Sequence, residues 1–308
     1  MISYILLVTG LLILLVGGKL LVDGATSIAA RLGLSAGLIG LTVVAFGTSA
    51  PELLVSITAA LKGASDIAVG NVVGSNISNI TLVLGISALI YPILITRSIL
   101  KLDYTFTVVT TVVFFLLSWN GIISLGEGIF LIILLVAVNF YFFKKIKRIG
   151  IDDDENSRPK QRSPIITVSM ILAGIAGLYL GSEMFVDNGV FIAGNLGISE
   201  RIIGVTVIAI GTSLPELATS VMAALKKETD IAIGNILGSN MMNVLCIIGI
   251  TAIVRPIEVS TLFIYGDYLW MIGFTLLLFP LMRINYTISR VSGGVLIVGY
   301  CAYLLLLL

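Results

Sequence analysis

The sequence predicts an all-α membrane protein in which ten transmembrane helices form two five-helix repeats of inverted topology. Three observations predict this fold. Hydrophobic residues make up 58% of the 308 residues and charged residues only 11%, whereas a soluble domain has about 25% charged residues. Apolar segments long enough to span a bilayer recur along the whole chain. The second half of the sequence also repeats the first half at a constant offset.

The apolar segments give the expected helix boundaries. The helices are expected at residues 2–30, 36–61, 66–91, 103–120, 125–146, 164–194, 200–225, 230–254, 262–282 and 291–307. The second and seventh are expected to be broken at mid-membrane, because Gly and Pro interrupt them there. The N-terminus has no basic region before its apolar stretch, so it is expected to form the first span and not a signal peptide.

The internal repeat is strongest around the two expected breaks. Residues 40–61 and 204–225 share 14 identities over 22 positions without a gap. The same offset of 164 residues relates Gly17 to Gly181 and Gly85 to Gly249. Because each half contains five spans, an odd number, equivalent helices must cross the membrane in opposite directions. The two copies of a mid-helix motif then face each other across the centre of the protein.

A polar segment separates the halves. Residues 148–163 contain the acidic run 152–155 and one proline, with a second at residue 164. This composition predicts a solvated linker between an N-terminal repeat of residues 1–147 and a C-terminal repeat of residues 164–308. Binding of regulatory Ca²⁺ by the acidic run is an alternative to a simple charged loop.

The distribution of Lys and Arg predicts the orientation. If loops alternate between the two sides, fourteen basic residues lie on the side of the linker and three on the other, Lys62, Arg201 and Arg255. The linker is therefore expected in the cytoplasm, and both termini outside the cell membrane. Lys19 remains within the first helix. Lys19/Asp23 in the first helix and Glu183/Asp187 in the sixth are spaced four residues apart near span ends, and they are expected to anchor at the interface or to pair structurally.

Each break has the sequence Gly-Thr-Ser-x-Pro-Glu, at residues 47–52 and 211–216. The glycine allows the first half-helix to end, which leaves its last carbonyl groups without partners. The Thr and Ser hydroxyls can cap the next half-helix, in which the proline suits the first position because no amide hydrogen is needed there. Glu52 and Glu216 follow in that turn, where the helix dipole favours an ionised carboxylate. The alternative is a structural buried acid.

These groups form a set of oxygen ligands. Hard cations such as Na⁺ and Ca²⁺ prefer oxygen, whereas zinc usually recruits His or Cys. The chain has no His, and its two cysteines, Cys246 and Cys301, lie in apolar stretches at unrelated positions. The sequence therefore predicts no resident cofactor, no disulfide framework and no enzyme, since no nucleophile–base arrangement is present.

The third helix of each half adds a polar stripe. Asn71, Ser75 and Asn79 lie four residues apart on one helical face, and Asn235, Ser239 and Asn243 repeat them. Such a stripe is costly against lipid, so it is expected to face the broken helix. Interhelical hydrogen bonding without ion contact is the alternative. Gly70 and Gly74 are expected to permit close approach of a neighbouring backbone.

Charge counting indicates antiport. No basic residue is expected near the two acids, which would repel each other or become protonated without a cation. One Ca²⁺ neutralises two carboxylates, and so do two Na⁺, with any third Na⁺ held by neutral oxygens. The two loads compete for the same acids, as an antiporter requires.

The chain resembles the sodium/calcium exchangers of the cation/calcium exchanger superfamily. The resemblance covers nearly the whole chain and includes the two Gly-Thr-Ser-x-Pro-Glu motifs and the two Gly-Asn-x-x-Gly-Ser-Asn-x-x-Asn motifs at residues 70–79 and 234–243. The proton/calcium branch usually has a Gly-Asn-x-x-Glu pattern in the broken helices, which this chain lacks.

The resemblance implies a set of ligand positions. Glu52 and Glu216 would hold Ca²⁺ with the backbone carbonyls of Thr48 and Thr212, and Asn79 and Asn243 would line the middle. The implied Na⁺ ligands are the Ala45 carbonyl, Thr48, Ser49 and Ser75 and, in the mirror-image site, the Ala209 carbonyl, Thr212, Ser213 and Ser239.

Some relatives, including potassium-dependent exchangers, have an acid at the position of Asn243. Its absence keeps the site charge at −2 and implies that exchange of three Na⁺ for one Ca²⁺ is electrogenic. The resemblance also implies that the first and sixth helices slide against the rest. Gly17-Gly18 and Gly174, Gly177 and Gly181 would suit that movement, with simple packing as the alternative.

The expected partners are Na⁺, Ca²⁺ and the lipid bilayer, without nucleic acid and without a required oligomer. Two other functions remain open at this point. A H⁺/Ca²⁺ or broader cation antiporter would use the same acids, because carboxylates also titrate. A cation channel belongs to another class, but it would usually repeat its filter around a pore by oligomerisation and would need no shared acid pair.

Overall fold

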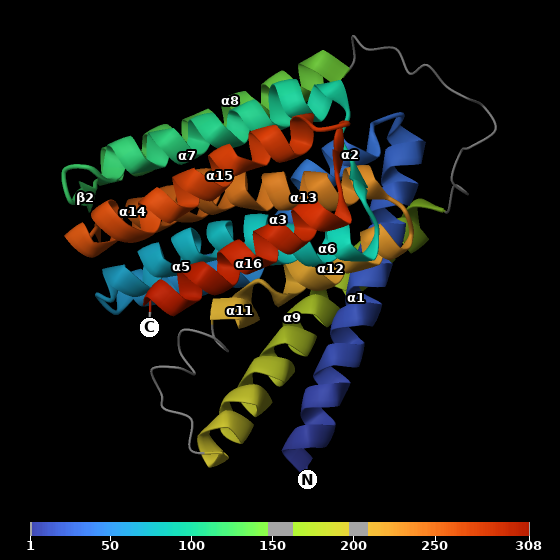
Figure 1. Cartoon of the computed structure of the whole chain (residues 1–308), viewed down its shortest axis with the longest axis horizontal. Coiled ribbons are helices and arrows are strands. Elements are labelled where there is room, and N and C mark those ends of the chain that lie inside the picture. Colours follow the sequence, from blue (N-terminus) through green and yellow to red (C-terminus); the bar gives the residue numbers. More distant parts are fainter. Residues whose placement is uncertain (1, 147–162, 197–208, 308) are drawn as a thin grey trace.

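The computed structural model describes residues 2–146, 163–196 and 209–307, and this part of the chain is almost entirely helical (Figure 1). The first half contains α1 (Ile2–Leu32), α2 (Ala36–Ile39), α3 (Ala45–Thr48), α4 (Ala50–Leu61), α5 (Ser65–Ser78), α6 (Leu84–Ile90), α7 (Tyr104–Ser118) and α8 (Leu125–Ile146). The second half contains α9 (Pro164–Asn195), α11 (Ala209–Thr212), α12 (Leu214–Leu225), α13 (Thr229–Met242), α14 (Gly249–Val254), α15 (Tyr268–Arg283) and α16 (Arg290–Leu307).

Several of these helices are continuous with one another through π-helical turns. Such turns occupy Gly40–Val44, Asn79–Val83, Ile99–Asp103, Asn243–Ile248 and Phe263–Asp267. The helix of α5 and α6 thus runs from Ser65 to Ile90, and that of α13 and α14 from Thr229 to Val254. π-Helical turns are rare and frequently mark functional sites, and two of these begin at Asn79 and Asn243.

The predicted helices agree closely with those in the described residues. Seven continuous helices are long and apolar enough to cross a membrane, and the pair Ala36–Thr48 and Ala50–Leu61, bent by 45°, makes an eighth. Leu214–Leu225 and α16 are shorter apolar helices. Residues 200–208 of the expected seventh helix lie outside the described residues. The chain is a multi-pass membrane protein.

Local sequence explains where helices begin and end. The Ser163 hydroxyl accepts a hydrogen bond from the amide of Ile166, and Pro164 occupies the first turn of α9, which is the usual N-terminal arrangement. Ser35 caps α2 in the same way, with the amide of Leu38 as donor. Gly33 adopts φ +63° directly after α1, which ends that helix at little cost.

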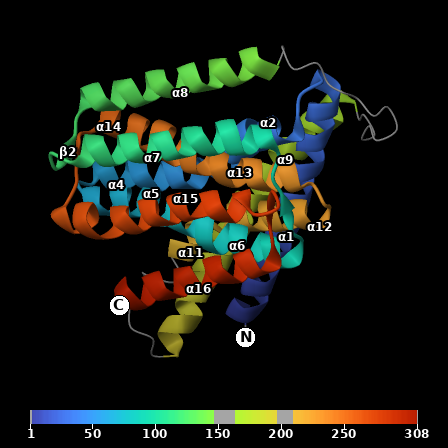
Figure 2. The same ribbon diagram turned by 45° about the horizontal axis from the view of Figure 1, so that its top comes forward.

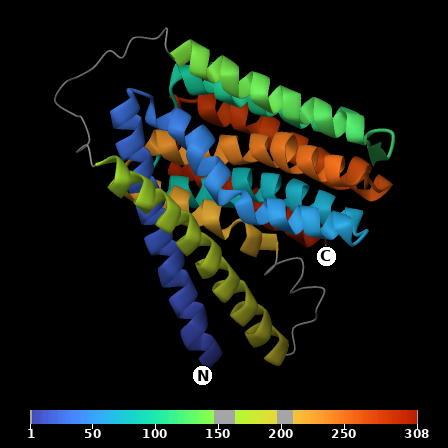
Figure 3. The ribbon, with the colours of Figure 1, turned by 180° about the vertical axis from the view of Figure 1, so that it is seen from behind.

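The two longest helices, α1 and α9, lie side by side and cross the remaining helices at an angle (Figures 1 and 3). Glycines make their contact close. A methyl group added at Gly174 would lie 2.7 Å from the amide nitrogen of Leu21, and one at Gly17 would lie 2.8 Å from that of Leu178. The Ser27 and Thr167 hydroxyls also form a hydrogen bond of 2.9 Å across the pair. The glycines predicted for movement therefore bring these two helices into backbone contact with each other.

The other long helices form a bundle with the most buried spans inside. In the 18-residue core of Thr229–Val254, 83% of residues are buried, and in that of Ser65–Ile90, 72%. The corresponding share for α8 is 22%, and α8 lies along one side of the bundle (Figure 2). The polar stripes predicted on the third and eighth helices thus belong to the two innermost helices.

Two short antiparallel strand pairs connect the halves. β1 (Ile93–Leu94) pairs with β4 (Thr287–Ile288), and β2 (Ile122–Ile123) pairs with β3 (Ile257–Glu258). Each pair joins a connection in the first half to one in the second half. Because the helix of residues 99–118 runs from β1 to β2, the pairs lie at its opposite ends.

The close approach predicted for Gly70 and Gly74 is found at their repeats, Gly234 and Gly238, and stays a prediction for Gly70 and Gly74 themselves. A methyl group at Gly234 would lie 2.5 Å from the Gly37 carbonyl oxygen, and one at Gly238 would lie 2.4 Å from that of Leu41. Among the described residues, a methyl group at Gly70 would meet only the Phe263 ring, at 3.4 Å, and one at Gly74 would meet nothing within 4 Å. The helix that the repeat would place against them includes residues 201–205, which are outside the described ranges.

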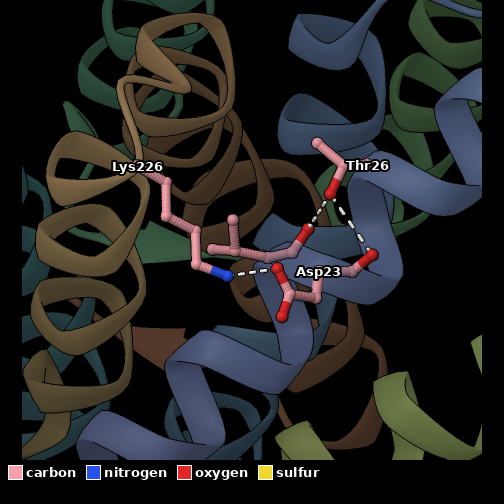
Figure 4. A network of polar contacts seen from close by, with 4 residues as sticks. Asp23, Thr26 and Lys226 are labelled. Atoms are coloured by element: carbon pink, nitrogen blue, oxygen red, sulfur yellow. Dashed lines mark hydrogen bonds and ion pairs between the residues drawn. The ribbon is translucent and has the colours of Figure 1, made fainter. Parts of the chain in front are cut away.

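Asp23 on α1 forms a salt bridge with Lys226, just beyond α12 (Figure 4). The Thr26 hydroxyl donates to the Val22 and Asp23 carbonyls one turn earlier (Figure 4). The ion-pair partner of Asp23 is thus Lys226 and not Lys19. Of the two roles expected for Lys19 and Asp23, the structural pairing with each other is wrong, and interface anchoring stays a prediction. The ion pair ties α1 to the second half of the chain.

Candidate functional site

The two breaks have nearly identical backbones. α3 ends at Thr48, and Ser49 (φ −86°, ψ 6°) separates it from α4. α11 ends at Thr212, and Ser213 (φ −88°, ψ 5°) separates it from α12. Each first half-helix therefore continues one residue past the glycine that was expected to end it. Pro51 and Pro215 are the second residues of the second half-helices, one position later than predicted and still within the first turn.

The expected capping role of the serines is wrong. Neither Ser49 nor Ser213 makes a side-chain cap on the following half-helix. Ser49 Oγ donates to Glu216 Oε1 at 3.0 Å, and Ser213 Oγ shares a hydrogen bond of 2.7 Å with Ser78 Oγ. Both hydroxyls form hydrogen bonds with buried polar groups of the opposite half of the chain.

Glu52 and Glu216 are fully buried. Glu216 Oε1 accepts hydrogen bonds from Ser49 and from Ser239 Oγ at 3.4 Å. Within the described residues, Glu216 Oε2 and both carboxylate oxygens of Glu52 have no partner. No Lys or Arg in the same part of the chain forms a salt bridge with either acid. A buried, unpaired carboxylate is very costly, so these two acids favour a bound cation or a proton.

The break of the first half contacts the inner helix of the second half. Thr48 Oγ1 lies 3.1 Å from Asn235 Oδ1 and 3.3 Å from Ser239 Oγ. The hydroxyl also donates to the Ala45 carbonyl at 3.2 Å, which accepts from the Ser49 amide as well. The expected ligands Thr48, Ser49 and Ser239 are thus adjacent to Glu216. The Ala45 carbonyl is engaged by two donors inside its own helix.

The remaining expected Na⁺ ligands are Ser75, Ala209, Thr212 and Ser213, and their role as ligands stays a prediction. Ser75 is buried, and its hydroxyl has no partner among the residues that the structure describes. Its counterpart Ser239, by contrast, donates to a carboxylate. Ala209 begins α11, and Thr212 ends it beside Ser213. The two ligand sets are therefore equivalent in sequence but differ in the contacts of Ser75 and Ser239.

The first asparagine of each polar stripe binds the broken helix of its own half. Asn71 Nδ2 donates to the Glu52 carbonyl at 3.1 Å and to Ser56 Oγ at 2.9 Å. Asn235 Nδ2 lies 3.5 Å from the Glu216 carbonyl and 3.0 Å from Ser220 Oγ. The stripes therefore face the broken helices, as predicted. These two asparagines hold the second half-helices in place.

Asn79 and Asn243, predicted to line the middle, are fully buried at the start of their π-helical turns. Both polar side-chain atoms of Asn79, and Oδ1 of Asn243, are without partners in the described ranges. Asn243 Nδ2 donates to Asn76 Oδ1 at 3.0 Å. Buried oxygen atoms of amides, a hydroxyl and carboxylates thus have no partner within the described residues, and oxygen atoms of these kinds suit hard cations.

Sequence reasoning missed three residues of this region. Asn76 and Asn240 are buried beside the predicted stripe, and Asn240 Nδ2 donates to the Asn76 carbonyl at 3.2 Å. Their recurrence within the Gly-Ser-Asn repeat was the available signal. Ser182 on α9 donates to the Gly211 carbonyl at 2.8 Å. Pro215 has no amide hydrogen to offer that carbonyl, so Ser182 replaces the lost donor, and no repeat marks it because its counterpart is Gly18.

Two broken helices meeting at buried acids, within a bundle of apolar helices, define a membrane ion antiporter. The chain belongs to the sodium/calcium exchanger protein family, whose model matches residues 2–144 and 166–308. It is 36% identical to the putative antiporter CaxA of Alkalimonas amylolytica, over 100% of this chain and 99% of that protein. It is 32% identical to the sodium/calcium exchanger MaX1 of Methanosarcina acetivorans, over 99% and 98% of the two chains.

A solved structure of the sodium-calcium exchanger NCX_Mj, soaked with zero Na⁺ and Ca²⁺, has the same fold. It aligns with a TM-score of 0.85 and 30% identity over 99% of both chains. The chain is also 25% identical to the Ca(2+)/H(+) antiporter ChaA of Bacillus subtilis, over 78% of this chain and 74% of that one. The relatives are transporters, and the chain is not an enzyme.

Proposed function

We propose that this protein exchanges Na⁺ for Ca²⁺ across the cell membrane by alternating access. The observation that supports this most directly is the pair of fully buried carboxylates, Glu52 and Glu216, with three of their four oxygens unpartnered within the described residues. Cations that neutralise both acids lower the free energy of the change between access states. An empty site would keep two uncompensated negative charges in the membrane interior during that change. Membership of the sodium/calcium exchanger family favours Na⁺ and Ca²⁺ as the two loads.

We assign Ca²⁺ to the two glutamates and the carbonyls of Thr48 and Thr212, near Asn79 and Asn243. The Na⁺ ligands of this proposal are Thr48, Ser49, Ser75 and the Ala45 carbonyl and, in the mirror-image site, Thr212, Ser213, Ser239 and the Ala209 carbonyl. With a site charge of −2, exchange of three Na⁺ for one Ca²⁺ moves one net positive charge per cycle. Transport is then electrogenic.

The architecture of this proposal is ten spans in two inverted repeats, residues 1–147 and 164–308, joined by residues 148–163. The family model matches the chain as two separate segments. At the repeat offset β1 corresponds to β3 and β2 to β4, so exchanging the two halves turns the β1–β4 pair into the β2–β3 pair at the other end of the helix of residues 99–118. Two glycine contacts are related in the same way. A methyl group at Gly293 would lie 2.7 Å from the Gly85 carbonyl oxygen, and one at Gly128 would lie 2.8 Å from that of Gly249.

Contacts between basic residues and helix ends support the proposed orientation, in which the linker is cytoplasmic and both termini are outside. Arg255 donates to the Leu61 carbonyl, next to Lys62, so two basic residues assigned to the outer side are neighbours. Lys227 lies 5.9 Å from the centre of the Tyr91 ring, and Arg290 donates to the Leu89 carbonyl. The residues assigned to the cytoplasmic side thus meet at the other end of the bundle.

Uptake of Ca²⁺ into proteoliposomes tests the exchange. Vesicles loaded with Na⁺ and diluted into Na⁺-free buffer should accumulate Ca²⁺, and an inside-positive potential should accelerate the loss of Na⁺ that drives uptake. Glu52→Gln and Glu216→Gln should abolish accumulation, while Glu258→Gln, the same change at an exposed acid in β3, should not. Similarity to a Ca(2+)/H(+) antiporter keeps proton coupling as the second candidate. Equal uptake driven by a pH gradient without Na⁺ would establish it.

A further inference from the structure

The central asparagines differ in how firmly they are held, although they occupy equivalent positions. Asn243 Nδ2 donates to Asn76 Oδ1 at 3.0 Å, which leaves Asn243 Oδ1 as the free atom of that amide. Asn79, its counterpart, has no partner on either side-chain atom within the described residues. An amide presents a donor on one side and an acceptor on the other, so a hydrogen bond to one side fixes what the other side offers.

The orientation of Asn76 is fixed in turn by Met271 on α15. Asn76 Nδ2 lies 3.7 Å from Met271 Sδ. A thioether sulfur can accept a hydrogen bond but cannot donate one, so the NH₂ group of Asn76 must face it. The Oδ1 of Asn76 then faces Asn243, and only the NH₂ group of Asn243 can meet it.

The equivalent residues of the repeat lack this chain of contacts from Met271 through Asn76 to Asn243, which we call the relay. The residue equivalent to Met271 is Thr107, whose hydroxyl donates to the Asp103 carbonyl within its own helix. Asn240, equivalent to Asn76, donates to the backbone carbonyl of Asn76 and not to Asn79. Asn76 and Asn240 are equally buried, with 1% and 2% of their surface exposed. They differ because the side chain of Asn76 binds the amide of Asn243, whereas Asn240 does not bind the amide of Asn79.

We propose that Asn76 is a positioning residue that turns the carbonyl oxygen of Asn243, and not its NH₂ group, toward the Ca²⁺ between the two glutamates. The inference rests on the proposed function. An NH₂ group turned toward a cation would repel it, whereas a fixed carbonyl oxygen is a ligand that needs no reorganisation on binding. Asn243 thereby provides an oxygen ligand without adding a third negative charge. Asn76 touches no ion and acts through Asn243.

The test is Ca²⁺ binding to the purified protein by isothermal titration, with transport measured in parallel. Asn76→Ala should weaken Ca²⁺ binding about fivefold or more, the change expected from losing one buried hydrogen bond that orients a ligand. Asn240→Ala, the matched change at the equivalent position, should alter it less than about twofold. Equal effects of the two substitutions would overturn the proposal, because they would indicate general damage to the core.

A double-substitution cycle separates positioning from packing. In an Asn243→Asp background both oxygens of the side chain are acceptors, so its orientation no longer matters. There Asn76→Ala should not weaken Ca²⁺ binding, because Asn76 Oδ1 no longer has a donor at position 243. If Asn76→Ala weakened Ca²⁺ binding as much in this background as it does in the protein with Asn243, the relay would be contradicted.

Met271→Leu covers the case in which Asn76→Ala does not fold. This nearly isosteric change removes the acceptor that fixes Asn76 and should weaken Ca²⁺ binding about two- to threefold. Met282→Leu, at another buried methionine of α15, should not, and equal effects would overturn the proposal. Wild-type protein that binds Ca²⁺ with this dependence on Asn76 but does not exchange it for Na⁺ would refute the proposed function and leave the role of Asn76 intact.

Discussion

Ser49 donates a hydrogen bond of 3.0 Å to Oε1 of Glu216, so the break in the first half of the chain is tied to the acid in the second half. The mirror-image contact, from Ser213 to Glu52, is replaced by one between Ser213 and Ser78. Two nearly identical motifs thus have different partners in one structure. This asymmetry fits the proposed alternating access, in which the two halves of an inverted repeat would exchange their arrangements between access states.

Replacing Ser49 with Ala should weaken the response to Na⁺. A hydrogen bond to a charged group contributes about 1.5–3 kcal/mol, so the Na⁺ concentration for half-maximal Ca²⁺ uptake should rise about tenfold. Proteoliposome uptake at graded Na⁺ measures it. Ser98→Ala, at an exposed position, is the control and should leave the curve unchanged. An unshifted curve for Ser49→Ala would remove this residue from the Na⁺ site.

Replacing Ser182 with Gly copies the residue found at the equivalent position, Gly18. The Gly211 carbonyl then loses the donor that replaces the missing amide of Pro215. We expect a loss of about 1–3 kcal/mol in the free energy of unfolding, because a buried carbonyl is left unpaired. Thermal unfolding of the purified protein measures this loss.

Ser27→Ala is the matched control for Ser182, since it removes a hydrogen bond between α1 and α9 and leaves the break untouched. It should lower stability without changing Na⁺ dependence. Ser182→Gly should change both. The same transport profile for the two variants would argue against a role for Ser182 at the break.

Glycine substitutions test whether α1 and α9 act as one unit. Gly174→Ala would place a methyl group 2.7 Å from the backbone of α1 and must push the helices apart. We therefore expect strongly reduced transport and a protein less stable by about 1–3 kcal/mol. Gly194→Ala, near the end of α9, meets nothing within 4 Å among the described residues. It should be neutral or slightly stabilising, because Ala favours a helix over Gly. Equal tolerance of both changes would show that the close packing is dispensable.

The ion pair of Asp23 with Lys226 predicts a pH-dependent effect. Burial, and next the negative charge of Asp230, raise the pKa of Glu228, whereas Lys226 lowers that pKa. Lys226→Met therefore leaves Asp23, Glu228 and Asp230 facing one another without their cation. Because a raised carboxyl pKa means stability that is lost as the pH rises through it, the variant should lose more stability at pH 8 than at pH 5.

Thermal unfolding at the two pH values checks this expectation. Lys62→Met, the equivalent residue of the first half, is exposed and should show no such dependence on pH. A pH-independent loss in Lys226→Met would mean that packing of the lysine chain, and not its charge, stabilises this contact.

The sequence alone determined the helices, the repeat and the places of the two breaks. These features are local or compositional: apolar segments must span the bilayer, and a glycine followed closely by a proline, which has no amide hydrogen, favours a break in a helix. The absence of His, together with the paired Glu52 and Glu216, restricts the site to oxygen ligands on composition alone. The facing of Asn71 and Asn235 toward the broken helices was predictable as well, because polar side chains avoid lipid.

Only the tertiary structure decided which of two equivalent groups pairs with which. Ser49 and Ser213 have the same local sequence and backbone, yet one binds an acid and the other a serine, because their partners are 167 and 135 residues away in the chain. Likewise, Asn243 is oriented and Asn79 is not, since the thioether of Met271 stands on one side and a hydroxyl on the other. A duplicated motif specifies the ligands, and packing between the halves decides which of them are engaged.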